Sequence, residues 1–139
     1  MSWCEDFIAA FNTHQVEPML AICSPDIKWE DVSGHIDYDG HDGVKQMIEL
    51  TLMAIPDCKF TYHGGLKLEN SYMVEWTMSG NAFGTDFACR GASVGETNDQ
   101  GAIVHNRDYW DSRSFPGMPG GPENPSMDDV EAMKTAADG

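Results

Sequence analysis

Two aspartates that lie among aromatic residues on strand-like segments are the side chains of this sequence best suited to chemistry. Asp31 lies in segment 29–34 (WEDVSG), and Asp108 lies in segment 106–111 (NRDYWD). An apolar pocket disfavours the ionised form of a carboxyl group, so its pKa rises and it can exchange protons near neutral pH. The two segments predict proton transfer in a small apolar cavity, with Asp31 as the base and Asp108 as the proton donor.

Each aspartate also has an interpretation without chemistry. Asp31 would then cap the turn at 32–34, and Asp108 would pair with Arg107 or Arg113 at the edge of a sheet. Carboxyl groups with perturbed pKa values gather at functional sites, which favours the catalytic interpretation of both.

Aromatic and polar residues on the same strands are candidates for contact with a ligand. Side chains alternate between the faces of a strand, so Asn106 and Trp110 share the face of Asp108. On the strand expected at 72–80 the choice of face stays open, because a shift of one residue inverts the two faces. The candidate ligand-contacting residues are Trp29, Tyr62, His63, Trp76, Asn106 and Trp110. The alternative is ordinary core packing for the aromatic residues and an exposed sheet position for His63.

Charge and length exclude several classes of partner. The chain has 139 residues and a formal net charge of −15. This length suits one domain with a hydrophobic core, and the negative charge repels nucleic acids and anionic membranes. No apolar run approaches the roughly 20 residues that span a bilayer, and the first residues lack the features of a signal peptide. We therefore expect a cytoplasmic protein that binds a small apolar ligand, with no nucleic-acid or membrane partner.

The sequence predicts neither a metal site nor a cofactor. Its four cysteines are widely spaced and form no C-x-x-C pair, so we expect free and mostly buried thiols. Segment 35–42 alternates histidines and aspartates, but it lacks the full calcium-loop pattern and is interpreted as an acidic loop.

Hydrophobic periodicity and turn residues predict helices followed by antiparallel hairpins. The expected helices lie at 2–12, 18–22 and 42–54, and the expected strands lie at 27–32, 58–68, 72–80, 83–95 and 102–110. Together they predict an α+β fold in which a curved sheet covers the helices and leaves a cone-shaped cavity. We expect a single domain at 1–115, followed by a Pro- and Gly-rich tail at 116–139 that contains a short helix.

The order of these elements resembles the NTF2-like superfamily and, within it, the SnoaL-like polyketide cyclases, ketosteroid isomerases and limonene epoxide hydrolases. Segment 29–34 is similar to the strand that carries the base of ketosteroid isomerases, and Asp31 falls at the position of that base. Segment 101–111 is similar to the last strand of SnoaL-like cyclases and limonene epoxide hydrolases, and Asp108 falls on their acid/base aspartate. The resemblance covers roughly 3–115 and implies an NTF2-like cone, with three N-terminal helices packed on a strongly curved mixed or antiparallel sheet.

The sequence also departs from these families. Phe7 and Ser93 fall where ketosteroid isomerases carry their two oxyanion donors, and Thr77 and Ser79 fall near the Arg and Asp positions of limonene epoxide hydrolases. Taken as a whole, the resemblance implies a SnoaL-like, cofactor-independent acid–base enzyme that cyclises, isomerises or hydrates a small apolar carbonyl or epoxide compound. The departures keep a non-catalytic small-molecule-binding protein as the alternative.

The resemblance further implies a homodimer formed through the open face of the sheet. Arg107 and Tyr109 are expected to point outward on the last strand, and both residue types are enriched at the cores of interfaces. Each cavity would be closed within its own chain.

Overall fold

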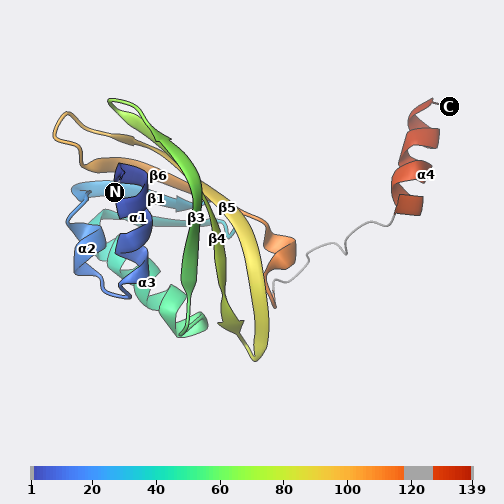
Figure 1. Ribbon diagram of the computed structural model, residues 1–139, viewed down its shortest axis with the longest axis horizontal. Helices are drawn as coiled ribbons and strands as arrows, with labels where there is room; N and C mark the ends of the chain where they lie inside the picture. The colour runs from blue at the N-terminus through green and yellow to red at the C-terminus, as the bar shows by residue number, and fades with distance from the viewer. Residues whose placement is uncertain (1, 118–126, 139) are drawn as a thin grey trace.

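A six-stranded mixed sheet curves around the helices that pack on its concave face (Figure 1). The computed structural model describes residues 2–117 and 127–138. In chain order the elements are α1 (Trp3–Asn12), α2 (Glu17–Leu20), β1 (Cys23–Asp31), β2 (Ile36–Asp39), α3 (Gly40–Ala54), β3 (Lys59–Lys67), β4 (Ser71–Ala82), β5 (Thr85–Thr97), β6 (Ile103–Trp110), the 3₁₀ turn η1 (Ser112–Ser114) and α4 (Met127–Asp138). The α+β cone and the three N-terminal helices that the sequence predicts are confirmed, and α4 is the short helix expected in the tail.

The order of the strands places the two aspartate-bearing strands next to each other. The sheet runs β2-β1-β6-β5-β4-β3, with β1 parallel to β6 and every other neighbouring pair antiparallel. Strands β1 and β6 lie far apart in the sequence, so local hairpin signals do not predict their pairing. This single parallel pair positions the candidate site.

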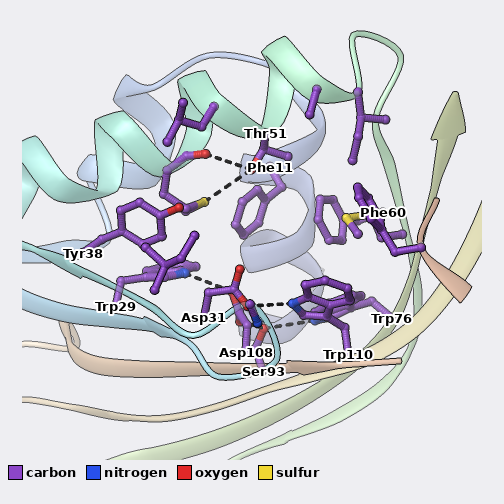
Figure 2. A pocket seen from close by; sticks show the side chains of 18 residues that line it. Phe11, Trp29, Asp31, Tyr38, Thr51, Phe60, Trp76, Ser93, Asp108 and Trp110 are labelled. Atoms are coloured by element: carbon purple, nitrogen blue, oxygen red, sulfur yellow. Dashed lines mark hydrogen bonds between the residues drawn. The ribbon is translucent and has the colours of Figure 1, made fainter. Parts of the chain in front are cut away.

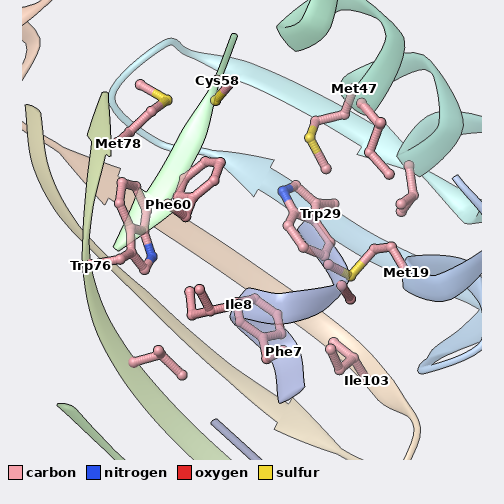
Figure 3. Packing of buried hydrophobic residues seen from close by; sticks show 14 of the residues in the cluster. Phe7, Ile8, Met19, Trp29, Met47, Cys58, Phe60, Trp76, Met78 and Ile103 are labelled. Atoms are coloured by element: carbon pink, nitrogen blue, oxygen red, sulfur yellow. The ribbon is translucent and has the colours of Figure 1, made fainter. Parts of the chain in front are cut away.

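Helix α1 begins at a capping box and contributes an aromatic stripe to the core. The side chain of Ser2 accepts a hydrogen bond from the backbone N–H of Glu5, and the side chain of Glu5 bonds back to the N–H of Ser2. Phe7 stacks on Trp29 of β1 with ring centroids 6.2 Å apart, and Phe11 meets the same indole edge-on at 5.8 Å. Figure 3 shows Phe7 and Trp29 within the buried cluster between α1 and the sheet. The packing fixes the strand that carries Asp31.

The segment between β1 and α3 differs from the prediction of an acidic loop. Residues 36–39 form the short strand β2, which pairs antiparallel with β1 and places Tyr38 opposite Trp29. Its residue types have the period of a strand, since Ile36 and Tyr38 alternate with two aspartates, and Tyr38 is buried while the other three are exposed. Aspartate is depleted in strands, so the acidic composition favours a loop. Among the histidines of the segment, His41 lies 2.9 Å from the carbonyl oxygen of Cys23 through its Nε2 atom.

Strand β1 is also longer than predicted. It starts at Cys23, whereas the sequence suggested that Ser24 and Pro25 end the second helix. The register against β6 shifts between Cys23 and Lys28, and an irregularity of this kind accommodates a proline within a strand.

The hairpin between β4 and β5 turns within residues expected to start a strand. Phe83 and Gly84 have φ values of 55° and 82° between the paired residues Ala82 and Thr85. Two successive residues with positive φ fit the tight turn whose twist matches that of the strands. Phe83 is exposed in this turn. Its hydrophobic side chain suggests the start of a strand, but the strand begins two residues later, at Thr85.

The structure also bears on the predictions for the cysteines and for the Pro- and Gly-rich break. All four cysteines are free and buried, as expected. In the described chain, no helix combines the length and apolarity needed to cross a membrane. Most of the predicted Pro- and Gly-rich break lies outside the described residues.

Alternation on β6 places Arg107 and Tyr109 on the outer face of the sheet. The guanidinium group of Arg107 donates two hydrogen bonds, of 2.9 and 2.7 Å, to the carboxylate of Glu96. Beyond them the register aligns Leu66, Met73 and Val94 across β3, β4 and β5, and the first two are at least half exposed. These exposed apolar side chains lie on the face expected to form the homodimer, which remains a prediction.

Candidate functional site

A cavity of about 310 Å³ lies between α1, α3 and the concave face of the sheet (Figure 2). Its volume is at the lower end of the range of about 300–1,000 Å³ for small-molecule pockets, so it suits a small ligand. The lining residues are Phe11, Trp29, Asp31, Gly34, Ile36, Tyr38, Met47, Leu50, Thr51, Ala54, Ile55, Phe60, Trp76, Met78, Ser93, Asp108, Trp110 and Phe115. These described lining residues include no lysine, arginine or histidine, so the charges they contribute are negative.

The parallel pairing of β1 with β6 brings the two carboxyl groups together in the wall of this cavity. Asp31 is the register partner of Asp108, and Trp29 is the register partner of Asn106. Because side chains two residues apart share a face, all four point to the concave side of the sheet. Figure 2 shows Asp31 and Asp108 close together below Phe11.

Three donors hold the carboxyl group of Asp108. The hydroxyl of Ser93 donates to Oδ1 at 2.6 Å, the amide of Asn106 donates to the same atom at 2.8 Å, and the indole of Trp29 donates to Oδ2 at 2.9 Å. Since the donors come from three strands, the position of this group is fixed by the sheet.

Two further residues orient these donors. The indole Nε1 of Trp76 donates to Ser93 Oγ at 3.0 Å, so the Ser93 hydroxyl is free to donate toward Asp108. The hydroxyl of Tyr72 donates to Asn106 Oδ1 at 2.6 Å, which turns the amide nitrogen of Asn106 toward the carboxyl group. The network is thus directional from the core to Asp108.

Burial raises the pKa of Asp108 to about 6. The three hydrogen bonds oppose this rise because they stabilise the ionised form, while the negative charge of Asp31 adds to it. Loss of hydration is therefore the dominant cause. The result is a carboxyl group that changes protonation near neutral pH, the property that general acid–base chemistry requires.

Among the described residues, hydrogen bonds reach only one oxygen of Asp31. Its Oδ1 atom accepts from the Trp110 indole at 2.7 Å and from the backbone N–H of Gly34 at 2.9 Å, while no described residue donates to Oδ2. A Cβ atom built on Gly34 would lie 2.5 Å from Oδ2, so a glycine is required for the carboxylate to sit over this turn. The hydroxyl of Ser33 bonds both the N–H and the carbonyl of Trp110, which fixes the indole donor.

The structural alternatives for the aspartates have different outcomes. Asp31 does cap the turn at 32–34, and it lies in the cavity wall as well. Asp108 makes no ion pair with Arg107, whose partner is Glu96, and it has none with Arg113 among the described contacts.

The structure brings only some of the predicted ligand-contacting residues to the cavity. Trp29, Trp76 and Trp110 line it, and the open choice on β4 is settled in favour of the face that carries Trp76. Asn106 is fully buried behind Asp108, so it positions that carboxyl group without lining the cavity.

The predictions for Tyr62 and His63 are not met, because neither is among the described lining residues. Phe60, on the same strand, is the residue of β3 that reaches the cavity. His63 lies on the exposed side of the sheet, where its Nε2 atom is 2.6 Å from the hydroxyl of Thr77. A register shift between Tyr62 and Gly64 follows, and sequence periodicity cannot reveal such a shift.

Sequence reasoning missed Ser93 and Tyr38 as parts of the site. The resemblance marks Ser93 only as the replacement of an oxyanion donor, whereas the structure shows that it donates to Asp108; a polar residue in a predicted core strand is the signal that points to such a role. Tyr38 was missed because its strand was interpreted as a loop. Within the part of the chain that the structure describes, no three His, Cys, Asp or Glu side chains gather as metal ligands.

Solved structures of similar fold support the architecture. A hypothetical protein from Catenulispora acidiphila with a ketosteroid isomerase-like fold, determined in complex with trimethylamine, has a TM-score of 0.75 at 18% identity over 88% of this chain and 95% of that chain. AclR, a putative hydroxylase from Streptomyces galilaeus, has a TM-score of 0.70 at 20% identity over 96% and 90%. A putative SnoaL-like polyketide cyclase from Shewanella denitrificans has a TM-score of 0.70 at 11% identity over 92% and 93%. At these identities the likeness shows the fold alone.

A search of curated proteins found no significant match. The family model described as the SnoaL-like domain matches residues 4–106, which include Asp31 and most of the strands that build the cavity. The chain therefore belongs to the SnoaL-like domain family and has the NTF2-like fold.

Proposed function

We propose that this protein is a cofactor-independent acid–base enzyme that acts on a small, neutral and mostly apolar carbonyl or epoxide compound. The observation that carries the proposal is the pair of carboxyl groups, Asp31 and Asp108, side by side in one apolar cavity. The described lining offers no cation to attract an anionic substrate, and its aromatic walls suit an apolar skeleton.

The free oxygen of Asp31 suits the role of base. With a carbonyl substrate, Oδ2 takes a proton from the carbon next to the carbonyl group, and the C–H electron pair forms a C=C bond. The carbonyl oxygen gains negative charge and takes the proton of neutral Asp108, which gives an enol. Asp31 then holds one proton and Asp108 is ionised, so protons and charge balance.

The enol has two productive fates. In isomerisation of a β,γ-unsaturated carbonyl compound the enol is a dienol, so Asp31 delivers its proton to the γ carbon, the remaining C=C bond moves next to the carbonyl group, and Asp108 regains the enol proton. In cyclisation, the enol carbon attacks a second carbonyl carbon of the same molecule, the new alkoxide takes the proton of Asp31, and Asp108 again regains the enol proton. Both cycles restore the starting protonation of the enzyme without a cofactor.

Proton exchange on a model ketone tests this proposal without knowledge of the natural substrate. The probe is 2-acetylnaphthalene in D₂O, and the measurement is protein-catalysed deuterium uptake at its methyl group by NMR. General acid–base catalysis contributes roughly 100- to 10,000-fold, so Asp31→Asn and Asp108→Asn should each slow uptake at least about 100-fold. Unchanged uptake in both variants would refute the assignment, as would a wild type that catalyses no uptake.

Asp37→Asn is the matched control for these variants. Asp37 lies on the exposed face of β2, so the substitution removes one carboxylate from the same region without touching the cavity. Uptake should stay at the wild-type level in this variant.

The second candidate function is binding of a small amine cation without chemistry. Two carboxyl groups within aromatic walls form a setting that attracts an ammonium group. The three donors to Asp108 stabilise its ionised form, which such a cation requires. The similar structure from Catenulispora acidiphila was solved with trimethylamine. Calorimetry with trimethylamine distinguishes the two functions: this candidate predicts tight binding that Asp31→Asn and Asp108→Asn weaken, with no deuterium uptake in the ketone assay.

A further inference from the structure

Tyr38 presents a hydroxyl group that the described protein leaves without a partner. The residue is 7% exposed, so its side chain is almost entirely enclosed. No described residue makes a hydrogen bond with its oxygen, although Trp29, Tyr72, Trp76 and Trp110 all use their polar atoms in the network around the aspartates. A polar group at the end of a largely buried side chain is therefore available to a ligand.

The position of Tyr38 directs this hydroxyl to the cavity. Tyr38 pairs with Trp29 across β1 and β2, so it shares the concave face with Asp31. It lines the same cavity as both aspartates, and Figure 2 shows its ring extending inward from β2 with the oxygen at the inner end. Among the described residues, no fully inaccessible side-chain oxygen or nitrogen lacks a partner, so the Tyr38 oxygen borders open space.

The electrostatic surroundings favour the donor form of this hydroxyl. Burial raises the pKa of Tyr38, and the nearby charge of Asp31 raises it further. The phenol therefore keeps its proton across the range in which Asp108 titrates. Since neither carboxylate can donate a hydrogen bond while ionised, Tyr38 is the polar lining group that donates irrespective of their protonation.

We propose that Tyr38 binds the oxygen atom of the ligand by donating a hydrogen bond to it inside the cavity. This inference rests on the proposed function for its ligand class, an apolar compound with a carbonyl or epoxide oxygen. During enolisation the same hydrogen bond strengthens as negative charge grows on that oxygen, so Tyr38 stabilises the transition state more than the bound ketone. Tyr38 thus supplies a donor that neither Phe7 nor Ser93 provides, since Ser93 is committed to Asp108.

Two probes of nearly equal shape isolate this hydrogen bond. The ketone 2-acetylnaphthalene has an oxygen to accept it, and the hydrocarbon 2-ethylnaphthalene has none. In Tyr38→Phe, the dissociation constant of the ketone should rise about five- to tenfold, the size of one net hydrogen bond, while that of the hydrocarbon stays within about twofold. The carbonyl stretching band of the bound ketone should move to higher frequency in the variant, because a hydrogen bond weakens the C=O bond.

Tyr62→Phe is the control, because it removes the hydroxyl of a half-buried tyrosine outside the cavity and should change neither constant nor band. Tyr38→Phe removes a hydroxyl with no described protein partner, so the melting temperature of this variant should not fall. An unchanged melting temperature excludes misfolding as the cause of a weaker ketone affinity. The inference is overturned if Tyr38→Phe leaves the ketone affinity and carbonyl band unchanged, or if the wild type excludes both probes.

The outcomes separate this inference from the proposed function. Binding and the infrared band need no turnover, so a lost hydrogen bond in Tyr38→Phe would support the inference even if the aspartate variants left deuterium uptake intact. Conversely, aspartate-dependent uptake with an unchanged band in Tyr38→Phe would support the enzyme and refute the role of Tyr38.

Discussion

The raised pKa of Asp108 predicts that this one side chain makes the fold less stable at neutral pH than in mild acid. The unfolded chain binds the Asp108 proton with the ordinary pKa of 3.8, whereas the folded chain binds it with a pKa of about 6. A rise from 3.8 to about 6, at 1.36 kcal/mol for each pH unit, corresponds to about 3 kcal/mol. This stabilisation from proton binding is fully present below pH 3.8 and is lost as the pH rises through about 6.

Comparison with Asp108→Asn isolates this contribution from all other titrations. The asparagine cannot ionise, so it escapes the cost of a buried charge, although it also rearranges the donors from Ser93 and Trp29. That rearrangement does not depend on pH. The difference in unfolding free energy, variant minus wild type, should therefore rise by about 2.4 kcal/mol between pH 4 and pH 7, most of the full effect, whatever its absolute value.

Urea unfolding at half-unit steps from pH 4 to pH 8, followed by tryptophan fluorescence, measures this difference. Asp37→Asn controls for the loss of one negative charge in a chain of net charge −15. Parallel pH profiles of the wild type and Asp108→Asn would refute the reasoning, because the Asp108 pKa would then be the same in the folded and unfolded states. An equal slope in Asp37→Asn would assign the effect to net charge instead of the site.

Three further predictions follow from contacts of the site and of the outer face. Trp29→Phe removes the donor to Oδ2 of Asp108, so the Asp108 pKa should rise above 6 in a carboxyl ¹³C NMR titration; a fall would contradict the network. Gly34→Ala places a methyl group against the Asp31 carboxylate and should reduce deuterium uptake at least about tenfold while the chain stays folded, whereas wild-type uptake would show that Asp31 is not positioned by this turn. The homodimer should tighten as salt screens the repulsion between acidic chains and weaken in Met73→Glu, and sedimentation of a monomer at micromolar concentration in low and moderate salt would exclude it.

The fold was largely predictable from sequence because its signals are local. The capping residue Ser2 marks the start of α1, and the turn residues at 69–71 and 98–101 delimit the hairpins of the sheet. Strand β2 escaped prediction because four residues of alternating pattern carry little information, and because its two aspartates are of a type that is depleted in strands. The start of β1 escaped because Pro25 normally argues against a strand.

The site was predictable only where strand alternation decides the outcome. Alternation placed Asp108, Asn106 and Trp110 on one face, and the structure agrees. The donors that set the pKa of Asp108 come from β1, β5 and β6, and the choice of which serine or indole meets which carboxyl group depends on register between strands. Register is a property of the assembled sheet, so Ser93 could not be assigned to Asp108 from its own segment.

The same dependence on register explains why chemistry can be concentrated at one point of this sheet. A shift of β6 by one residue against β1 would make Arg107 or Tyr109 the partner of Asp31, so a cation or a phenol would face the cavity and Asp108 would turn to the outer face. The backbone N–H of Val32 donates to the carbonyl of Asp108 at 3.0 Å just beyond β1, which extends the correct pairing to the turn under the Asp31 carboxylate. The contacts that hold the strands in register are therefore the contacts that place the two carboxyl groups together. A substitution that loosens this pairing should impair the site before it unfolds the domain.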